Sequence, residues 1–330
     1  MPRNPYFDPA KFHHTRSGFR NPEGSKQRPK FNVSIAREAA AFAAELFRSA
    51  GQNPFPEQHV IPETSSLQGY HHTESHNKLL WLGHASFLLK LGSHSILTDP
   101  YLTDYASPMP SRSTKRLIPA AISINKLPVV SCIVISHNHY DHLDTQALSL
   151  LAKRFPDVLV CVPLGLKALL ERSGFNQIVE LDWYDQHRHV DLMVTGLPAI
   201  HTSRRGINDH NHSLWCGFAI EANGYRVYFA GDTAYGPAFK QVGKSVGGFD
   251  LGLVPIGAYQ PRSLMETVHA TPEEAIQIGL DMGAKRLVGM HWGTIRLTTE
   301  PMQEPKQRFL AAKQAIPRAV LRIGETIPLD

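Results

Sequence analysis

Short apolar runs, separated by turn residues and by amphipathic stretches, dominate the chain from residue 79 onward. An apolar run of about four to eight residues predicts a buried strand, whereas apolar positions three and four apart predict a helix. We expect strands near residues 79–82, 87–91, 95–98, 133–136, 158–162, 178–181, 190–195, 214–221, 225–230, 251–255, 286–290 and 320–323. We expect helices near residues 145–154, 166–173, 271–282 and 306–315. Because the strands come in groups that end in helices, the pattern predicts an α/β fold with two sheets packed together and helices outside.

The first 75 residues follow a different pattern. Ser34 is a plausible N-cap for a helix that extends to about Ala50, where Gly51 would stop it. The apolar stripe of this helix, which we expect to dock on the core, consists of Ile35, Ala39, Phe42, Ala43, Leu46 and Phe47. Residues 51–75 are polar and rich in proline, which predicts a loop. We therefore divide the chain into an N-terminal basic arm and helix, residues 1–75, and a main domain, residues 76–330.

Composition narrows the class of protein. The chain has 330 residues, of which 42% are hydrophobic, enough to bury a substantial core. It contains neither an apolar run of about eighteen residues nor a secretory signal, so we expect a cytoplasmic protein without a transmembrane segment. Cys132, Cys161 and Cys216 are odd in number and widely separated, which favours free thiols over a disulfide framework.

The formal net charge of +5 is concentrated at the N-terminus. Residues 1–30 hold seven Lys and Arg against Asp8 and Glu23, whereas the other 300 residues hold 27 basic and 27 acidic side chains. The arm could lie on the domain or stay solvated, or residues 1–50 could attract the anionic surface of a membrane. We expect no nucleic-acid partner, because the rest of the chain is charge-neutral and shows no basic stripe.

The densest candidate chemistry directly follows the predicted strand near residues 133–136. Three histidines and one aspartate occupy six consecutive positions there: His137, His139, Asp141 and His142. Imidazole and carboxylate suit Zn²⁺ and neighbouring divalent metals, and the lack of a nearby cysteine pattern argues against a closed structural zinc site. A solvated turn is the ordinary alternative for such a loop, but four ligand-type groups at one strand end favour a metal site that is left open for water.

Three further candidates follow strand-like segments elsewhere, namely His201, Asp232 and His291. His137 and His139 lie two apart in an extended segment, so both can face one ion, which His201 would complete. Asp141 and His142 could hold a second ion with His291. Asp232 has two oxygens and could bridge both ions, or it could simply cap the next helix. Two such cations lower the pKa of a shared water, which predicts hydrolysis, although a redox-active iron pair stays open.

The order His-x-His-x-Asp-His resembles the ligand loop of the metallo-β-lactamase superfamily. Further motifs resemble the N-acylphosphatidylethanolamine-hydrolysing phospholipase D family, in the same order from about residue 79 to 296. They are Trp81–Ser86, Leu97–Pro100, Val162–Gly165, Phe229–Thr233, Pro255–Tyr259, His269 with Pro272–Ala275, and His291–Thr294. Residues 1–75 and the segment His201–Arg204 depart from the family pattern.

The resemblance implies a four-layer αβ/βα sandwich, with two mixed sheets face to face and helices outside. It also implies two Zn²⁺ per chain, with Mn or Fe as other candidates. One ion would be held by His137, His139 and His201, the other by Asp141, His142 and His291, with Asp232 between them. Asp99 and His84 would support the ligands through hydrogen bonds.

The implied reaction is hydrolysis of an N-acylphosphatidylethanolamine-type phospholipid to phosphatidic acid and N-acylethanolamine, through attack of a metal-bridging hydroxide on phosphorus. Asp141, Asp232 and His269 are then the catalytic candidates. His269 would orient the substrate or assist the leaving group, or it only begins a helix. The alternative keeps the fold and changes the substrate to a lactone, a cyclic nucleotide or a soluble phosphodiester. The resemblance also makes a homodimer an expectation.

Overall fold

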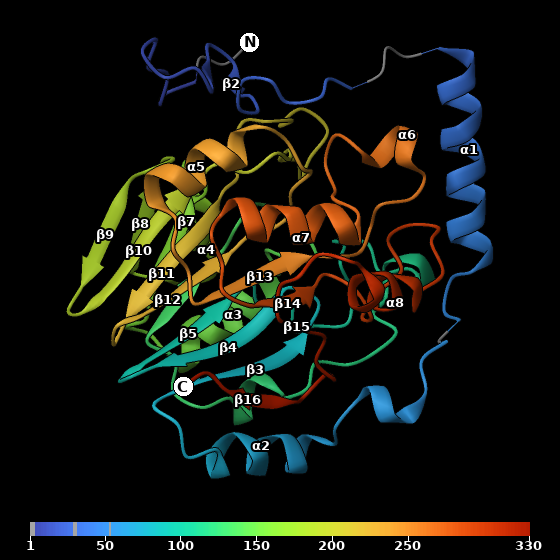
Figure 1. Ribbon diagram of the computed structural model, residues 1–330. Coiled ribbons are helices and arrows are strands. Elements are labelled where there is room, and N and C mark those ends of the chain that lie inside the picture. Colours follow the sequence, from blue (N-terminus) through green and yellow to red (C-terminus); the bar gives the residue numbers. More distant parts are fainter. Residues whose placement is uncertain (1–3, 29–31, 53) are drawn as a thin grey trace.

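Two seven-stranded sheets face each other in the computed structural model, which describes residues 4–28, 32–52 and 54–330 (Figure 1). The first sheet has the order β16-β3-β4-β5-β6-β7-β8 and consists of β3 Asn77–Gly83, β4 Ser86–Leu91, β5 His94–Thr98, β6 Cys132–Val134, β7 Leu159–Pro163, β8 Gln177–Leu181 and β16 Thr326–Pro328. The second has the order β15-β14-β13-β12-β11-β10-β9 and consists of β9 Gln186–His189, β10 Leu192–Leu197, β11 Gly217–Ala222, β12 Tyr225–Phe229, β13 Leu251–Pro255, β14 Leu287–Met290 and β15 Arg318–Ala319. A short hairpin of β1 His14–Thr15 and β2 Gly18–Phe19 lies apart from both sheets.

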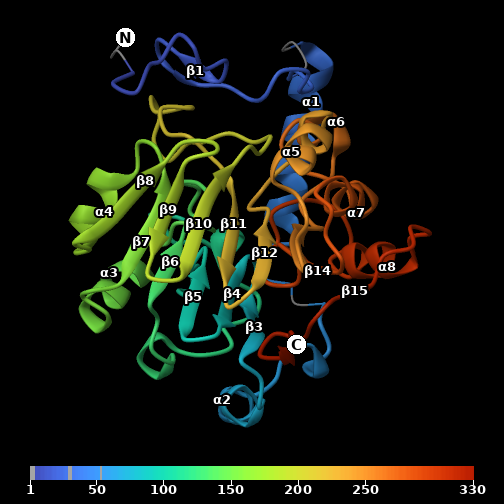
Figure 2. The ribbon, with the colours of Figure 1, turned by 60° about the vertical axis from the view of Figure 1, so that its left-hand side comes forward.

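Helices lie around the two sheets. They are α1 Val33–Arg48, α2 Glu63–His72, α3 Thr145–Arg154, α4 Lys167–Ser173, α5 Ala238–Val246, α6 Arg262–Met265, α7 Pro272–Asp281 and α8 Glu304–Ala311, with 3₁₀ turns η1 Glu57–His59, η2 Arg112–Thr114 and η3 Ile124–Lys126. Figure 2 shows α3 and α4 outside the first sheet, and α5 and α7 on the side of the second. The fold is therefore the predicted four-layer sandwich.

The two sheets repeat one pattern of strand directions. In each sheet three consecutive antiparallel pairings are followed by three parallel ones. Both sheets are therefore mixed, as predicted. Between them lies one core whose largest fully buried side chains include Trp81, Trp215, Tyr228, Phe218 and Phe229. Burial of these side chains, together with the many buried Leu, Ile and Val around them, stabilises the core.

Loops that follow the carboxyl ends of β5, β6, β10, β12 and β14 meet at one edge of the sandwich. β5 and β6 are parallel neighbours, and β10, β12 and β14 point the same way in the other sheet. The loop after β6 is fixed at its far end, because Asp144 caps α3 by accepting from the N–H groups of Gln146 and Ala147. This edge holds the candidate ligands.

Several predicted elements at the N-terminus are wrong. The N-cap of α1 is Asn32 rather than Ser34, and its Oδ1 accepts from the N–H of Ile35 at 3.0 Å. The predicted docking of the helix stripe is only partial: Ile35, Ala39, Phe42 and Leu46 are half-buried, no side chain of α1 is fully buried, and Phe47 is 83% exposed. The predicted loop 51–75 contains η1 and α2. In α2 only Ser66 and Tyr70 are buried, so the sequence shows no apolar stripe from which this helix could be recognised.

Strand boundaries in the second half are also displaced. The predicted strand 190–195 is β10, which begins two residues later because Val190 sits at the turn between β9 and β10, with φ 58° and an exposed fraction of 77%. Of the predicted strand 214–221, the first three residues bond elsewhere: the N–H of Leu214 donates to Leu164 O and that of Cys216 to Ser136 O. The predicted strand 320–323 is replaced by β15 and β16, and the predicted helix 306–315 is α8. An apolar run alone does not reveal which partner its amides meet.

Residues 4–28 lie across the end of the sandwich that is uppermost in Figure 1. The N–H of Phe19 donates to Asn211 O at 2.8 Å, and the hydroxyl of Tyr6 donates to Glu180 at 2.9 Å. Arg3 and Lys30, two of the basic residues counted in the arm, lie outside the described residues. No helix in the described part of the chain has the length and apolar character needed to cross a bilayer.

Candidate metal centre

Seven side chains at the edge of the sandwich form what we call the metal centre: His137, His139, Asp141, His142, His201, Asp232 and His291. The first group consists of His137, His139 and His201, whose ring nitrogens lie close together. Nε2 of His137 is 2.8 Å from Nδ1 of His139, and Nε2 of His201 is 3.2 Å from the same atom. Segments more than sixty residues apart therefore present three imidazole nitrogens to one point, as predicted for one ion.

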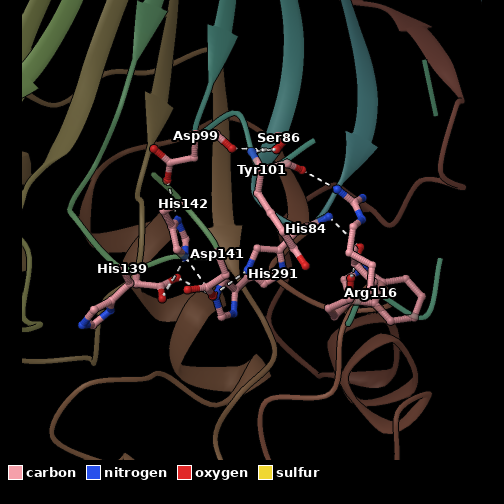
Figure 3. Close-up of polar contacts among 12 residues, drawn as sticks. His84, Ser86, Asp99, Tyr101, Arg116, His139, Asp141, His142 and His291 are labelled. Carbon is pink, nitrogen blue, oxygen red and sulfur yellow. Dashed lines mark hydrogen bonds and ion pairs between the residues drawn. The ribbon is translucent and has the colours of Figure 1, made fainter. Parts of the chain in front are cut away.

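The second group consists of Asp141, His142 and His291, joined by His84 (Figure 3). Oδ2 of Asp141 lies 3.5 Å from Nε2 of both His142 and His291. His84 approaches the same oxygen at 2.9 Å through Nε2, so it supports Asp141 as expected.

Asp232 lies between the two groups. Its Oδ2 is 3.2 Å from Nε2 of His142 and 3.8 Å from Nε2 of His201, and its Oδ1 is 3.1 Å from Nε2 of His291. Gly231 precedes it with φ 58°, and a Cβ there would lie 2.5 Å from the side chain of Ser136. The glycine thus lets the chain turn closely past the ligand loop and place both carboxylate oxygens among the histidines.

Hydrogen bonds from behind fix the orientation of three rings. Nδ1 of His142 bonds Oδ2 of Asp99 at 2.6 Å, and Nδ1 of His201 bonds the carbonyl of Val268 at 2.8 Å. Nδ1 of His137 lies 2.9 Å from the hydroxyl of Ser136. Each anchored ring therefore directs Nε2 into the centre, which is how metal-binding histidines are held.

Several atoms that face the centre have no hydrogen-bond partner and are placed to bind a cation. Nε2 of His142, Nε2 of His291 and Oδ1 of Asp232 are buried and form no hydrogen bond. Native proteins rarely leave buried polar atoms without a partner, because the lost hydration is costly. Imidazole nitrogen and carboxylate oxygen are a donor set for Zn²⁺, Mn²⁺ or Fe²⁺, so the residues fit a pair of divalent ions.

Electrostatics point the same way. Burial lowers the pKa of His137 and of His201 well below the ordinary value, so both rings are neutral, as metal ligation requires. Burial would also lower the pKa of His291, but Asp232 and Asp141 outweigh it and raise the value to about 9. The two buried carboxylates therefore draw positive charge into the centre.

His269 lies beside the metal centre, as the sequence predicted for a catalytic candidate. Its Nδ1 is 4.0 Å from Oδ2 of Asp232, and that nitrogen is buried without a hydrogen-bond partner. The ring centroid is 5.2 Å from that of His201. The alternative that His269 only begins a helix is incomplete, because α7 begins at Pro272 with its own cap, Thr271.

Sequence reasoning missed three supports of the centre. The hydroxyl of Ser136 contacts His137 and the carbonyl of Val268 contacts His201, and no sequence motif indicates either contact. Asn21 comes from the arm, and its Oδ1 accepts from the backbone N–H of His201 at 2.9 Å and from Nε1 of Trp215 at 3.1 Å. The arm is therefore part of the structure around a candidate ligand.

Comparison with known proteins places this arrangement in a family. The model of the beta-lactamase superfamily domain matches residues 94–292. The chain is 38% identical over 249 residues to N-acyl-phosphatidylethanolamine-hydrolyzing phospholipase D 1 of Caenorhabditis elegans, covering 72% of this chain and 70% of that protein. It is 40% identical over 262 residues to the uncharacterized protein Rv0906 of Mycobacterium tuberculosis, covering 76% and 69%.

Solved structures show the same fold. Igni18, a metallo hydrolase of Ignicoccus hospitalis, aligns with a TM-score of 0.56 at 22% identity and covers 76% of this chain and 97% of its own. The metallo-beta-lactamase fold protein YhfI of Bacillus subtilis aligns with a TM-score of 0.54 at 14% identity, covering 76% and 98%. Together with the ligand geometry, these matches show that the chain is a metal-dependent hydrolase of the metallo-β-lactamase superfamily and a relative of the N-acylphosphatidylethanolamine-hydrolysing phospholipases D.

Proposed function

We propose that this chain is a di-zinc phosphodiesterase that hydrolyses N-acylphosphatidylethanolamine-type phospholipids to phosphatidic acid and N-acylethanolamine. The observation that carries the proposal is the convergence of two ligand groups on Asp232, in a chain that is 38% identical to an enzyme of that name. His137, His139 and His201 would hold one ion, and Asp141, His142 and His291 the other. When bound, two such ions would lower the pKa of a shared water and offset charge that develops on a phosphoryl group.

The chain's own residues would position these parts. Asp232 supplies two oxygens between the groups, and Asp99 fixes the ring of His142 from behind. Burial lowers the pKa of His269 to about 4, so its ring is neutral. Its Nδ1 faces Asp232 without another partner, which makes it the candidate for orienting the substrate or relaying a proton near the leaving group. A group within hydrogen-bond reach of a reacting oxygen can donate the proton that the leaving alkoxide needs.

The lipid part of the proposal needs a surface that reaches a bilayer, and α1 supplies one. Val33, Ala40, Ala44 and Phe47 share one face of the helix, where Val33 is 67% exposed and Phe47 83% exposed. Arg37 is an exposed cation beside this face. An apolar face with basic neighbours suits an interface that contains anionic lipid.

Vesicle binding tests this surface. Phe47→Ser should weaken co-sedimentation with phosphatidylglycerol-containing vesicles, whereas Val129→Ser, which removes another apolar side chain that is 76% exposed, should not. Equal binding by both variants would remove α1 from the proposal. A change in oligomeric state in Phe47→Ser alone would instead assign the face to a second copy of the chain.

The activity is tested with zinc-loaded protein and detergent-dispersed N-acylphosphatidylethanolamine, with products identified by mass spectrometry. The proposal predicts phosphatidic acid and N-acylethanolamine in equal amounts. Hydrolysis of bis(p-nitrophenyl)phosphate without lipid turnover would favour the alternative of a soluble phosphodiester, and inactivity on both would leave the lactone or another substrate of the fold.

A further inference from the structure

A cleft with a volume of about 400 Å³ lies between the arm and the rim of the metal centre. The arm contributes Arg20, Asn21, Lys26 and Arg28 to its lining. The opposite wall includes Thr202 and Val268, the immediate neighbours of His201 and His269. The cleft therefore borders the metal centre, and its lining holds cations that have no role in the proposed hydrolysis.

Two neutral donors of this lining have no acceptor. Because Oδ1 of Asn21 accepts from both His201 and Trp215, its amide nitrogen must face away from them, and no described residue accepts a hydrogen bond from it. Thr267, which lines the same cleft, is 3% exposed, and its hydroxyl has no partner. A buried hydroxyl without a partner is uncommon and suggests a group that completes it.

Positive charge gathers at the same place. Desolvation, and after it the charge of Arg204, lower the pKa of Arg28, so the two cations lie within electrostatic range of each other. The same two arginines, together with burial, lower the pKa of His210, which also lines the cleft. No carboxylate of the described residues pairs with Arg28 or Arg204.

Nearby acids do not neutralise this pair. Asp209 accepts from the backbone N–H groups of Arg205 and Gly206, at 3.0 and 2.8 Å. Glu266 accepts from Lys26 at 2.9 Å. Glu23 is the one acid in the described lining, against the cations Arg20, Lys26 and Arg28. Two arginines within electrostatic range of each other and without a carboxylate partner suit a tetrahedral anion, which accepts several bonds at once.

We propose that the cleft between the arm and the loop 202–211 binds a phosphate-type oxyanion through Arg28, Asn21 and Thr267, with the exposed Arg204 of that loop adding positive charge from outside the lining. The anion would be free inorganic phosphate or the phosphomonoester of a phospholipid, and the second source rests on the proposed function because phosphatidic acid is its product. The cleft lies next to His201, so an anion held there would sit at the rim of the metal centre. In this proposal the docked arm both packs against the domain and forms one wall of the anion site.

Calorimetric titration of the metal-loaded protein with inorganic phosphate tests the site without reference to turnover. The metal centre itself can bind phosphate, so the account predicts two binding events per chain. Arg28→Gln combined with Arg204→Gln should weaken one event by about tenfold or more, because charge-assisted bonds are lost, and keep the other. The matched control Arg172→Gln with Arg188→Gln removes the same charge from exposed positions elsewhere and should keep both events.

Thr267→Val removes a single hydroxyl and keeps the shape of the side chain. It should weaken the same event by a few-fold, on the order of one neutral hydrogen bond, and it guards against misfolding of the double variant. Repeating the titration with dihexanoyl phosphatidic acid separates the sources: tighter binding than inorganic phosphate assigns the lipid phosphomonoester, and equal binding assigns the free ion.

A single binding event in the native protein, or two events that the double variant leaves unchanged, would overturn the proposal. Either result is independent of lipid hydrolysis, so the anion site and the proposed function can fail separately.

Discussion

Two buried clusters of histidine and aspartate lie among the described residues, and they differ in whether some of their ligand atoms are free. One is the metal centre; the other, which we call the Asp182 cluster, consists of His13, His14 and Asp182. By residue type and closeness both resemble metal sites, because their potential ligand atoms lie within 4.8 Å of one another. Composition alone would not separate them.

In the Asp182 cluster the ligand atoms already bond one another. Nε2 of His13 is 2.6 Å from Oδ1 of Asp182, and Nε2 of His14 is 2.9 Å from Oδ2. Nδ1 of His14 accepts from the backbone N–H of Asp8, so Nε2 carries the proton that it donates to Asp182. Lys11 supplies a positive charge to the same carboxylate at 2.6 Å. This cluster anchors the arm and needs no ion.

In the metal centre the reverse holds. The rings of His142 and His201 are bonded from behind, through Asp99 and Val268, and Nε2 of His142, Nε2 of His291 and Oδ1 of Asp232 face inward without a partner. The comparison teaches that a set of histidines and aspartates indicates a cation where some of the buried atoms that face one another have no hydrogen-bond partner.

The largest effect should follow from removing the charge of Asp232. Asp232→Asn keeps the shape of the side chain but weakens the hold on both ligand groups, so turnover of bis(p-nitrophenyl)phosphate should fall by roughly 10³-fold. Asp157→Asn, a change of the same type at an exposed position, should leave the rate unchanged. Near-native turnover in Asp232→Asn would mean that the carboxylate is not central.

Asp182→Asn should affect stability and not metal content. Loss of the charged acceptor removes bonds to Lys11, His13 and His14, so the free energy of unfolding should fall by about 2 kcal/mol, given partial exposure of Lys11. Urea unfolding and hydrogen exchange of residues 4–28 measure the change. A loss of bound metal in this variant would show that the cluster is a metal site after all.

The pH dependence of arm docking has a definite sign. Burial alone would raise the pKa of Asp182, but hydrogen bonds from His13 and Lys11 outweigh it and hold the value below the ordinary one. Stabilisation by this carboxylate is therefore complete above pH of about 4 and is lost as pH falls through the folded value. Exchange protection of residues 4–28 that stays unchanged between neutral pH and pH of about 2 would contradict this assignment.

A smaller effect should follow from Asp99→Asn. Asp99 does not face the centre but accepts from Nδ1 of His142, so its loss should weaken metal affinity by about 10- to 100-fold without abolishing binding. Competition with a chelator measures the affinity. Asp250→Asn, which removes a carboxylate paired with Lys285 on the surface, is the control and should have no effect.

Much of this architecture can be predicted from the sequence, because the candidate ligands directly follow predicted strands. The loop His137–His142 follows a buried strand, and Asp232 and His291 follow two more, so the layers and the ligand sets emerge from one pattern. The start of α7 is also predictable from local sequence, because Thr271 and Glu274 form a capping box close to the predicted first residue of the helix.

Other parts could not be predicted, because they depend on partners distant in sequence. Asn21 bonds His201 across 180 positions, and Asp182 joins Lys11 across 171. The stripe of α1 is wide enough for a core helix, yet the body covers only part of it. Apolar periodicity reports that a face is suitable for burial, not that something buries it.

Anomalous diffraction at the zinc edge, from crystals grown with zinc, tests the central claim most directly. The account predicts two peaks per chain, one among His137, His139 and His201 and one among Asp141, His142 and His291, with none between His13, His14 and Asp182. A metal centre without anomalous signal, or a peak in the Asp182 cluster, would contradict it.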